Sequence, residues 1–538
     1  MSLLLMLTLG WPLVLLLMLA AKPLQPLVVR LLALAPLPGL LLALASRGEA
    51  AWALRLPGGW SFGLDEAGAM LLGASALIWG AAGACATLWL KSQTDAPRFA
   101  MWWLLTLTGS LGVFAAADLA SFYLLYAAAS LPAYGLIVWH GDAAGRRAGR
   151  LTLAAALLGE ALLLAAFVLL AVAAPGQSLL IADGVAALAA SPVRDVAIAL
   201  LILGFGLKIG LVPLHAWMPL SYAAGPLFAA AALSGATSKA GIIGLIRFLP
   251  FDTAMQGWGM ALLAIGLFAA FYGVVLGLLQ RNPRMVLAYS SVSQLGQMAA
   301  ALGAGLALGS AQAASLVGFY ALYHVLVKGG LFLAIAAVAR ARRLVLITAS
   351  LAALGFAGLP LTGGGLTKLA LKPLTGDGPA EWLFTIAAIG SSLLMLHFIR
   401  LIRVLPASPR ITGAQSAWLF IFVLAMLLPW LLFPGVTGLA ASHALKPDVL
   451  LGLAWPVAAG LLIGWGLMAQ GRLPRGVTED PDLRGDPVPR LWDGAAHAAN
   501  WCIGQAAGLE QVTRRWSVSS SVLVLALVVF TLLLALGT

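Results

Sequence analysis

The chain has 538 residues, of which 62% are hydrophobic and only 9% are charged. A soluble domain carries about 25% charged residues, and the apolar runs occupy the whole length, so the composition excludes a soluble protein and predicts one that crosses the membrane many times. The basic residues behind the net charge of +12 lie mainly in the loops between those runs. This distribution indicates membrane topology and argues against a nucleic-acid partner.

Sixteen apolar runs of about 20 residues predict an all-α polytopic membrane protein with about 16 transmembrane helices. The expected spans are 2–20, 27–45, 67–90, 99–116, 119–139, 151–173, 195–217, 226–249, 256–279, 285–306, 312–338, 346–371, 380–404, 415–434, 449–470 and 518–537. The first run lacks a basic start and a clear cleavage site, so we interpret it as a span and not as a signal peptide.

The positions of the basic residues agree with this count. Of the 31 lysines and arginines, 21 fall in loops after odd-numbered spans, six in loops after even-numbered spans, and four inside spans. Cytoplasmic loops carry the excess of basic residues. We therefore expect a multi-pass protein of a bacterial-type inner (plasma) membrane with both termini on the outer face.

The expected spans divide the chain into six parts. They are three helices in 1–94, a first five-helix bundle in 95–250, a second in 251–405, two helices in 406–470, a polar linker with an amphipathic lateral helix in 471–517, and a last span in 518–538. Each bundle holds a lysine-bearing span and a span broken by glycine and proline, which is typical of inverted repeats. The amphipathic helix is expected to lie along the membrane or a partner subunit, with a plain solvated connector as the alternative.

The most informative stretch is 204–250, where Lys208 and Lys239 each lie deep within apolar sequence. A lysine near the bilayer centre is costly and marks an ion or proton pathway. Pro213, Pro219 and Pro226 are expected to break the helices between them, and broken helices at membrane depth occur only inside protein or beside a water-filled cavity. Two such lysines on consecutive spans predict a proton relay.

Two later spans extend this relay. His324 and Lys328 are four residues apart and so share one face of a helix, where a histidine can pass protons in both directions; a structural histidine is the alternative. Pro360 and three successive glycines predict a helix break over 359–365, directly before Lys368.

Glu160 is the one carboxylate well inside an expected span. An unpaired carboxylate there is costly, so we expect it to be the partner of Lys208, with an inert protonated side chain at a helix contact as the alternative. His215, on the break after Lys208, is a candidate for the cavity entrance or a structural residue. Asp118, at the junction of the fourth and fifth spans, is expected to be a helix cap or an interfacial residue and not a member of the relay.

The tenth span contains several polar side chains, of which Ser293 and Gln294 are candidates for supporting the relay by bonding neighbouring helices or holding water near Lys239. Helix packing alone would explain the serines. Cys85 and Cys502 predict no disulfide framework. Because no phosphate loop, nucleophilic triad or metal-ligand spacing is present, we expect no cofactor and no metal, and the chain is not expected to be an enzyme by itself.

Five motifs occur in a characteristic order and spacing: GLKIGLVPLHAWMPLSYAAGPL, SKAGIIGLIRF, RMVLAYSSVSQLGQM, YHVLVKGGLF and GLPLTGGGLTK. Together they resemble the antiporter-like membrane subunits of respiratory complex I, of multisubunit cation/proton antiporters and of membrane-bound hydrogenases. The resemblance covers about residues 95–405, and the amphipathic segment is similar to the lateral helix of the largest complex I member.

The resemblance implies relay roles at five positions. Lys208 corresponds to the family's seventh-helix lysine, which pairs with a glutamate, and Lys239 to the lysine of the eighth helix. His324 and Lys328 correspond to the central pair, and Lys368 to the terminal charged residue on the broken twelfth helix.

Two departures from the family pattern stand out. Ala127 occupies the position of the fifth-helix glutamate, and we hypothesise that Glu160 replaces it as the partner of Lys208. Leu220 and Tyr222 replace residues that are usually polar after the turn that follows His215.

The resemblance implies translocation of protons, or of a cation such as Na⁺ coupled to protons, by one subunit of a larger assembly in the lipid bilayer with other membrane subunits as partners. Such an assembly would resemble an NADH:quinone oxidoreductase or a related translocase. Three alternatives remain: a non-pumping structural subunit, a membrane subunit that feeds proton motive force to a soluble zinc-containing enzyme for inorganic carbon accumulation, and a stand-alone secondary transporter.

Overall fold

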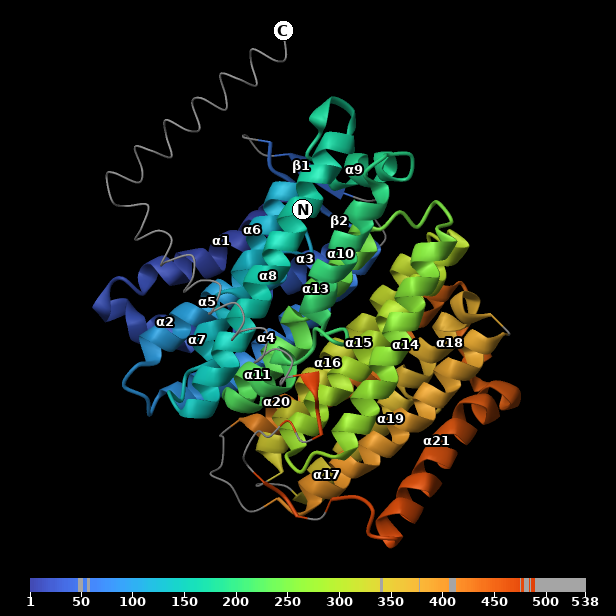
Figure 1. Cartoon of the computed structure of the whole chain (residues 1–538). Helices are drawn as coiled ribbons and strands as arrows, with labels where there is room; N and C mark the ends of the chain where they lie inside the picture. Colours follow the sequence, from blue (N-terminus) through green and yellow to red (C-terminus); the bar gives the residue numbers. More distant parts are fainter. Residues whose placement is uncertain are drawn as a thin grey trace, which may run out of the picture. The chain divides into compact units, whose positions relative to one another are not determined.

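The computed structural model describes residues 1–46, 52–55, 59–338, 342–376, 378–405, 413–474, 476–478, 483 and 485–488. The chain divides into two units, Met1–Arg484 and Gly485–Thr538, and the fold presented below is that of the first unit (Figure 1). The expected amphipathic helix after residue 490 and the last span, 518–537, lie outside the described residues.

Helices make up nearly all of the first unit. The first half contains α1 (Ser2–Met18), α2 (Gln25–Leu31), α3 (Leu37–Ala45), β1 (Trp52–Arg55), β2 (Ser61–Leu64), α4 (Glu66–Leu90), α5 (Ala96–Gly112), α6 (Leu119–Ser130), α7 (Ala133–Ile137), α8 (Ala143–Ala173), α9 (Ile181–Leu188), α10 (Arg194–Ile209), α11 (Trp217–Ala224), α12 (Leu227–Ala232) and α13 (Lys239–Phe248). The second half contains α14 (Gln256–Leu278), α15 (Pro283–Leu308), α16 (Ala313–Ala337), α17 (Arg342–Ala357), α18 (Gly363–Thr375), α19 (Pro379–Arg403), α20 (Ala414–Thr437) and α21 (Pro447–Ala469).

Within the described ranges, nine helices are long and apolar enough to cross a membrane, or ten if the bent pair at the amino terminus counts as one span. The chain is therefore a multi-pass membrane protein, but the count of sixteen is not confirmed. One reason is that several expected spans are broken: 27–45 is divided into α2 and α3, 346–371 is divided into α17 and α18, and in 195–217 helix α10 ends at Ile209, before α11 starts at Trp217.

Two of these breaks lie where proline and glycine predict them. Helix α10 ends at Gly210, which has a φ of 68° in the left-handed region that favours glycine. Helix α17 ends at Ala357, and α18 restarts after Thr362, whose hydroxyl accepts a hydrogen bond from the Gly365 amide. The glycines at 363–365 thus begin α18, and the break itself is shifted to 358–362.

Helix α16 lies at the centre of the first unit and is almost completely buried. It packs against α4, α15 and α20, and against the broken segment 227–248 (Figure 1). That segment is fully buried although a short π-helical turn, Leu233–Thr237, separates α12 from α13. Because both elements are enclosed by other helices, their lysines face protein and not lipid.

Helices α14 and α15 approach until their backbones touch. A Cβ atom added at Gly266 would lie 2.5 Å from the Ala300 nitrogen, and one at Gly303 would lie 2.7 Å from the Gly259 oxygen. Small residues at such positions let membrane helices pack closely without hydrophobic gain from water. This close contact, the α14–α15 seam, holds α15 against α14. Helix α15 carries a polar cluster that includes Ser290, Ser293 and Gln294.

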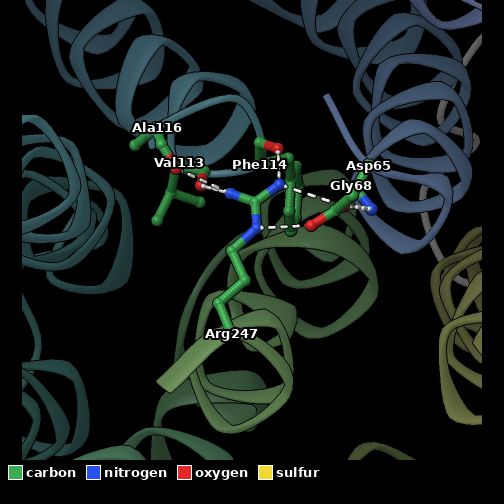
Figure 2. Close-up of polar contacts among 6 residues, drawn as sticks. All are labelled: Asp65, Gly68, Val113, Phe114, Ala116 and Arg247. Atoms are coloured by element: carbon green, nitrogen blue, oxygen red, sulfur yellow. Dashed lines mark hydrogen bonds and ion pairs between the residues drawn. The ribbon is translucent and has the colours of Figure 1, made fainter. Parts of the chain in front are cut away.

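A buried arginine connects three helices at one end of the unit. The Arg247 guanidinium pairs with the Asp65 carboxylate at 2.9 Å and donates to the carbonyl oxygens of Val113, Phe114 and Ala116 (Figure 2). Asp65 also caps α4 by accepting from the Gly68 amide. The end of α13 is thereby fixed to the start of α4 and the end of α5.

A small hairpin closes the same end. Strands β1 and β2 pair antiparallel, and the Gly63 amide donates to Ala115 at 2.8 Å in the segment that follows α5. Asp118 accepts from the amides of Ser61 and Ser121, at 2.7 and 2.8 Å. The expectation that Asp118 caps a helix is confirmed, since it is the N-cap of α6.

Candidate functional site

Lys208 lies in the last turn of α10 and points toward α6. Its Nζ donates a hydrogen bond of 2.7 Å to the Ser130 hydroxyl and lies 5.3 Å from the centre of the Tyr126 ring. The nearest polar partner of this lysine is therefore a neutral hydroxyl one helical turn beyond Ala127.

Glu160 lies on α8, where Gly159 and Gly204 bring α8 and α10 close together. The carboxylate is 5% exposed, and it interacts electrostatically with Lys208. Among the described residues, however, no ion pair joins the two, and Oε1 of Glu160 has no hydrogen-bond partner. The structure places Glu160 near Lys208 without the direct contact expected of a partner.

A cavity of about 40 Å³ adjoins Lys208. A site of about 10–15 Å³ holds one water, so this cavity has room for a few. Its polar lining comes from four helices and one π-helical turn and consists of Tyr126, Ser130, Thr152, Lys208, Ser221, Tyr222, Thr237 and Ser238. The cavity therefore extends from Lys208 to the residue that precedes Lys239.

Lys239 begins α13 directly after the π-helical turn. The side chain is fully buried, and its Nζ donates to the Ser234 carbonyl at 2.7 Å and to the Ser238 hydroxyl at 3.1 Å. A π-helical turn leaves backbone groups without regular partners and often marks a functional site. Here the turn supplies the carbonyl that holds the ammonium group.

His324 and Lys328 lie on α16, and both pack against the ring of Phe356. Lys328 Nζ donates to the Leu287 carbonyl at 3.0 Å and to the Ser290 hydroxyl. His324 is fully buried, and neither ring nitrogen has a hydrogen-bond partner within the described part of the chain. It interacts electrostatically with both Lys239 and Lys328.

Lys368 lies on α18, one turn after the break. Its Nζ is buried and has no hydrogen-bond partner among the described residues. The residue lines a second cavity, of about 290 Å³. This cavity is enclosed by α18, α19 and α21, and Gln297, Tyr320, Lys372, Glu381 and Asp448 contribute its other polar lining. Lys372 pairs with Glu381 at 3.8 Å and is exposed, as expected for a flanking lysine.

The supporting residues lie at contacts between helices. Gln294 accepts from the Tyr320 hydroxyl and donates to Ser391 at 3.0 Å, so it bonds α15 to the neighbouring helices α16 and α19. Ser293 is buried, and its backbone lies against Gly273 in the α14–α15 seam. His215 is buried with its ring 5.1 Å from the Tyr272 ring and is not part of the Lys208 cavity lining.

Sequence reasoning missed several members of this site. Ser130 and Ser238 contact lysines directly, and Tyr320 links the polar cluster of α15 to the second cavity. The signal available for Ser130 was its place three residues after Ala127 on the same helical face. No comparable signal marked Tyr320, because one tyrosine in an apolar helix resembles ordinary core.

The candidate site consists of four lysines and one histidine, with two cavities that have polar lining residues. Lys208 and Ser238, the residue before Lys239, line the first cavity; His324 and Lys328 lie on α16, and Lys368 lines the second cavity. No group of three or more histidines, cysteines or acidic residues within the described ranges is placed to hold a metal ion. The chemistry that these side chains permit is proton exchange between nitrogen bases and water.

Known proteins show the same sequence pattern. The family model for the transmembrane part of NADH:quinone oxidoreductase and Mrp antiporters matches residues 116–395. A subunit N of NADH-quinone oxidoreductase from Desulforudis audaxviator is 31% identical over 336 residues, which cover 58% of this chain and 65% of that relative. Hydrogenase-4 component B of Escherichia coli is 30% identical over 228 residues, covering 40% of this chain and 34% of the relative. The chain thus spans less than two thirds of either relative's length.

Solved structures show the same fold. A chain of the Mrp complex from Dietzia sp. DQ12-45-1b superimposes with a TM-score of 0.79 at 20% identity, over 100% of this chain and 63% of that one. A chain of an archaeal membrane-bound sulfane sulfur reductase does so with a TM-score of 0.67 at 21% identity, over 84% and 98% of the two chains. The family match includes the elements that carry all four intramembrane lysines, and the chain belongs to the NADH:quinone oxidoreductase/Mrp antiporter transmembrane family.

Proposed function

We propose that this chain translocates protons, or a cation coupled to protons, as the antiporter-like subunit of a larger membrane complex. The proposed relay runs from Glu160 and Lys208 through Lys239, His324 and Lys328 to Lys368. Membership in the family supports the proposal, and the energy is expected to come from partner subunits in the membrane.

The observation that carries the proposal is the complete burial of three titratable side chains, Lys239, His324 and Lys328, inside elements long and apolar enough to span a membrane. His324 interacts electrostatically with both lysines. Charged groups in such positions are expensive and mark ion pathways. A purely structural subunit gains nothing from this cost, which favours the pump over the scaffold.

Two cavities beside the relay residues have room for water. Lys208 and Ser238 line the first, and Lys368, Glu381 and Asp448 line the second. Proton transfer over longer distances needs such intervening waters or hydroxyls. The basic loops suggest that both termini lie on the outer face of a plasma membrane.

A flux measurement tests the proposal. The full chain is reconstituted into vesicles with a pH-sensitive dye inside, and a potassium diffusion potential drives proton entry. We expect wild-type flux well above that of empty vesicles and a loss of at least about tenfold for Lys239→Met, because methionine cannot carry a proton. Wild-type flux equal to empty vesicles would contradict proton translocation by this chain.

A purification experiment tests the place of the chain in an assembly. The tagged chain is extracted from its native membrane in mild detergent, and every copurifying protein is identified. We expect sister antiporter-like chains or redox subunits. Recovery with a single soluble zinc protein would instead favour the carbon-accumulating system, and recovery alone in an active form would favour a secondary transporter.

A further inference from the structure

Three of the four intramembrane lysines share an unexpected feature, which is a serine hydroxyl bonded to the ammonium nitrogen. Lys208 contacts Ser130 at 2.7 Å, Lys239 contacts Ser238 at 3.1 Å, and Lys328 contacts Ser290. These serines come from different elements, namely the end of α6, the residue before α13, and α15. A common packing motif therefore does not explain the repetition.

In two of the pairs, the helix backbone orients the hydroxyl. Ser130 donates its own proton to the Tyr126 carbonyl at 2.8 Å, and Ser238 donates to the Ser234 carbonyl at 3.1 Å. A hydroxyl has one donor and two acceptor lone pairs. Because its proton is committed to a carbonyl four residues earlier, its lone pairs face the lysine and accept from it.

A neutral acceptor has a different effect from a carboxylate. A carboxylate stabilises the ammonium by its full charge and so opposes loss of the proton. A hydroxyl stabilises the ammonium by a hydrogen bond alone and, when it rotates, can donate to the neutral amine. The lysine then keeps a partner in both protonation states, which a relay that loads and unloads protons requires.

Lys368 provides the contrast. It has no serine partner among the described residues. The residue lines the larger cavity, but its Nζ is buried. The serines thus accompany the lysines that lie away from the larger cavity.

We propose that Ser130, Ser238 and Ser290 are positioning residues that hold the relay lysines in both protonation states, in place of carboxylate partners. This inference rests on the proposed function. At Lys208 it assigns the direct contact to Ser130 and leaves Glu160 an indirect electrostatic role.

A double-mutant cycle tests whether the pair exists, independently of transport. The thermal-unfolding midpoint of the detergent-solubilised full chain is measured for Ser130→Ala, Lys208→Met and the double variant. We expect Ser130→Ala to lower the midpoint when Lys208 is present and to have little effect when it is methionine. An equal decrease in both backgrounds would overturn the pairing.

The pH profile of flux tests the positioning role. Removing an acceptor from an ammonium group favours its deprotonation, so each of the Ser130→Ala, Ser238→Ala and Ser290→Ala variants should reach half-maximal flux about one pH unit lower. Ser130→Thr, which retains the hydroxyl, should keep the wild-type profile. Ser392→Ala is the matched control, because Ser392 is equally buried and its hydroxyl donates only to the Ala388 carbonyl.

The outcomes separate the two proposals. If the three alanine variants have wild-type flux and an unshifted pH profile, the positioning role is overturned and the proposed function stands. A shift of the same size in Ser392→Ala has the same consequence. A wild-type chain without flux overturns the proposed function and the relay role together, while the mutant cycle still decides whether Ser130 and Lys208 interact.

Discussion

Ala127 and Ser130 illustrate how one substitution changes the chemistry of a site. They lie one turn apart on α6, and Ala127 carries a methyl group where the resemblance to antiporter-like subunits implies a glutamate. The hydroxyl of Ser130 makes the direct contact with Lys208, and the Glu160 carboxylate acts on it from α8 without an ion pair. Lys208 is therefore held by a hydrogen bond and a more distant charge.

Glu160→Gln measures what that distant charge contributes. We expect vesicle flux to fall by about threefold to tenfold, because the amide removes a charge near Lys208 without removing its hydrogen bond. The control is Glu66→Gln, which alters an exposed carboxylate in the first turn of α4. Flux equal to wild type in Glu160→Gln would show that Glu160 is a passive side chain at a helix contact.

Lys239→Arg separates charge from proton exchange. An arginine keeps the positive charge but does not deprotonate in proteins, so we expect flux to fall at least about tenfold, as in Lys239→Met. The exposed Lys91, just after α4, gives the control Lys91→Arg, which should have no effect. Retained flux in Lys239→Arg would indicate that this residue contributes only its positive charge and does not exchange a proton.

At the scale of elements, the α14–α15 seam determines where the polar cluster of α15 lies. Gly266→Ala would place a methyl group 2.5 Å from the Ala300 backbone nitrogen, so the helices must separate. We expect a clearly lower thermal-unfolding midpoint. Gly257, on the same helix, has no atom within 4 Å of an added Cβ.

Gly257→Ala is therefore the matched control for that variant. Alanine is favoured over glycine in a helix by about 1 kcal/mol, so the midpoint should stay constant or rise. Equal behaviour of the two variants would contradict the close backbone contact in the seam.

The broken segment 227–248 is the second element that matters for function. The π-helical turn provides the Ser234 carbonyl to Lys239, and Arg247 fixes the far end of α13 to α4 and α5. The lysine thus sits between an irregular turn and an anchored helix. This combination holds its Nζ in one place while leaving backbone carbonyls available to it.

At the scale of the whole molecule, the Asp65–Arg247 pair joins two elements. Asp65 lies between strand β2 and helix α4, and Arg247 lies on α13, the helix that begins with Lys239. The Asp65 side chain is 44% exposed, so it is only partly removed from water. Partial desolvation alone would raise the pKa of Asp65, but the Arg247 guanidinium and the Gly68 amide outweigh it and hold that pKa below its usual range. A carboxylate with a depressed pKa stabilises the fold above the unfolded pKa of about 4 and loses that contribution as pH falls through the folded value.

We therefore expect part of the acid-induced fall in the thermal-unfolding midpoint below about pH 4 to come from Asp65. In Asp65→Asn the midpoint should be lower at pH 7 and should decrease less between pH 5 and pH 3. The exposed Asp252 provides the control Asp252→Asn, which should keep the wild-type pH dependence. An unchanged slope in Asp65→Asn would contradict the assigned role.

The sequence by itself determined the class of protein and the family, and it singled out the lysines of the proposed relay. Lysines in long apolar runs are so costly that their positions alone indicate a pathway, and glycine and proline marked the breaks near 210 and 360. The division into two inverted bundles and the sidedness of the loops stay predictions.

Only the tertiary structure decided which groups contact those cations. Ser130 is 78 residues from Lys208, and Ser290 is 38 residues from Lys328. Serine is common in membrane helices for packing reasons, so composition does not distinguish a packing serine from one that bonds a lysine. The same holds for the Arg247 pair and the role of Gln294, because contacts between distant helices depend on how the helices pack and not on local sequence.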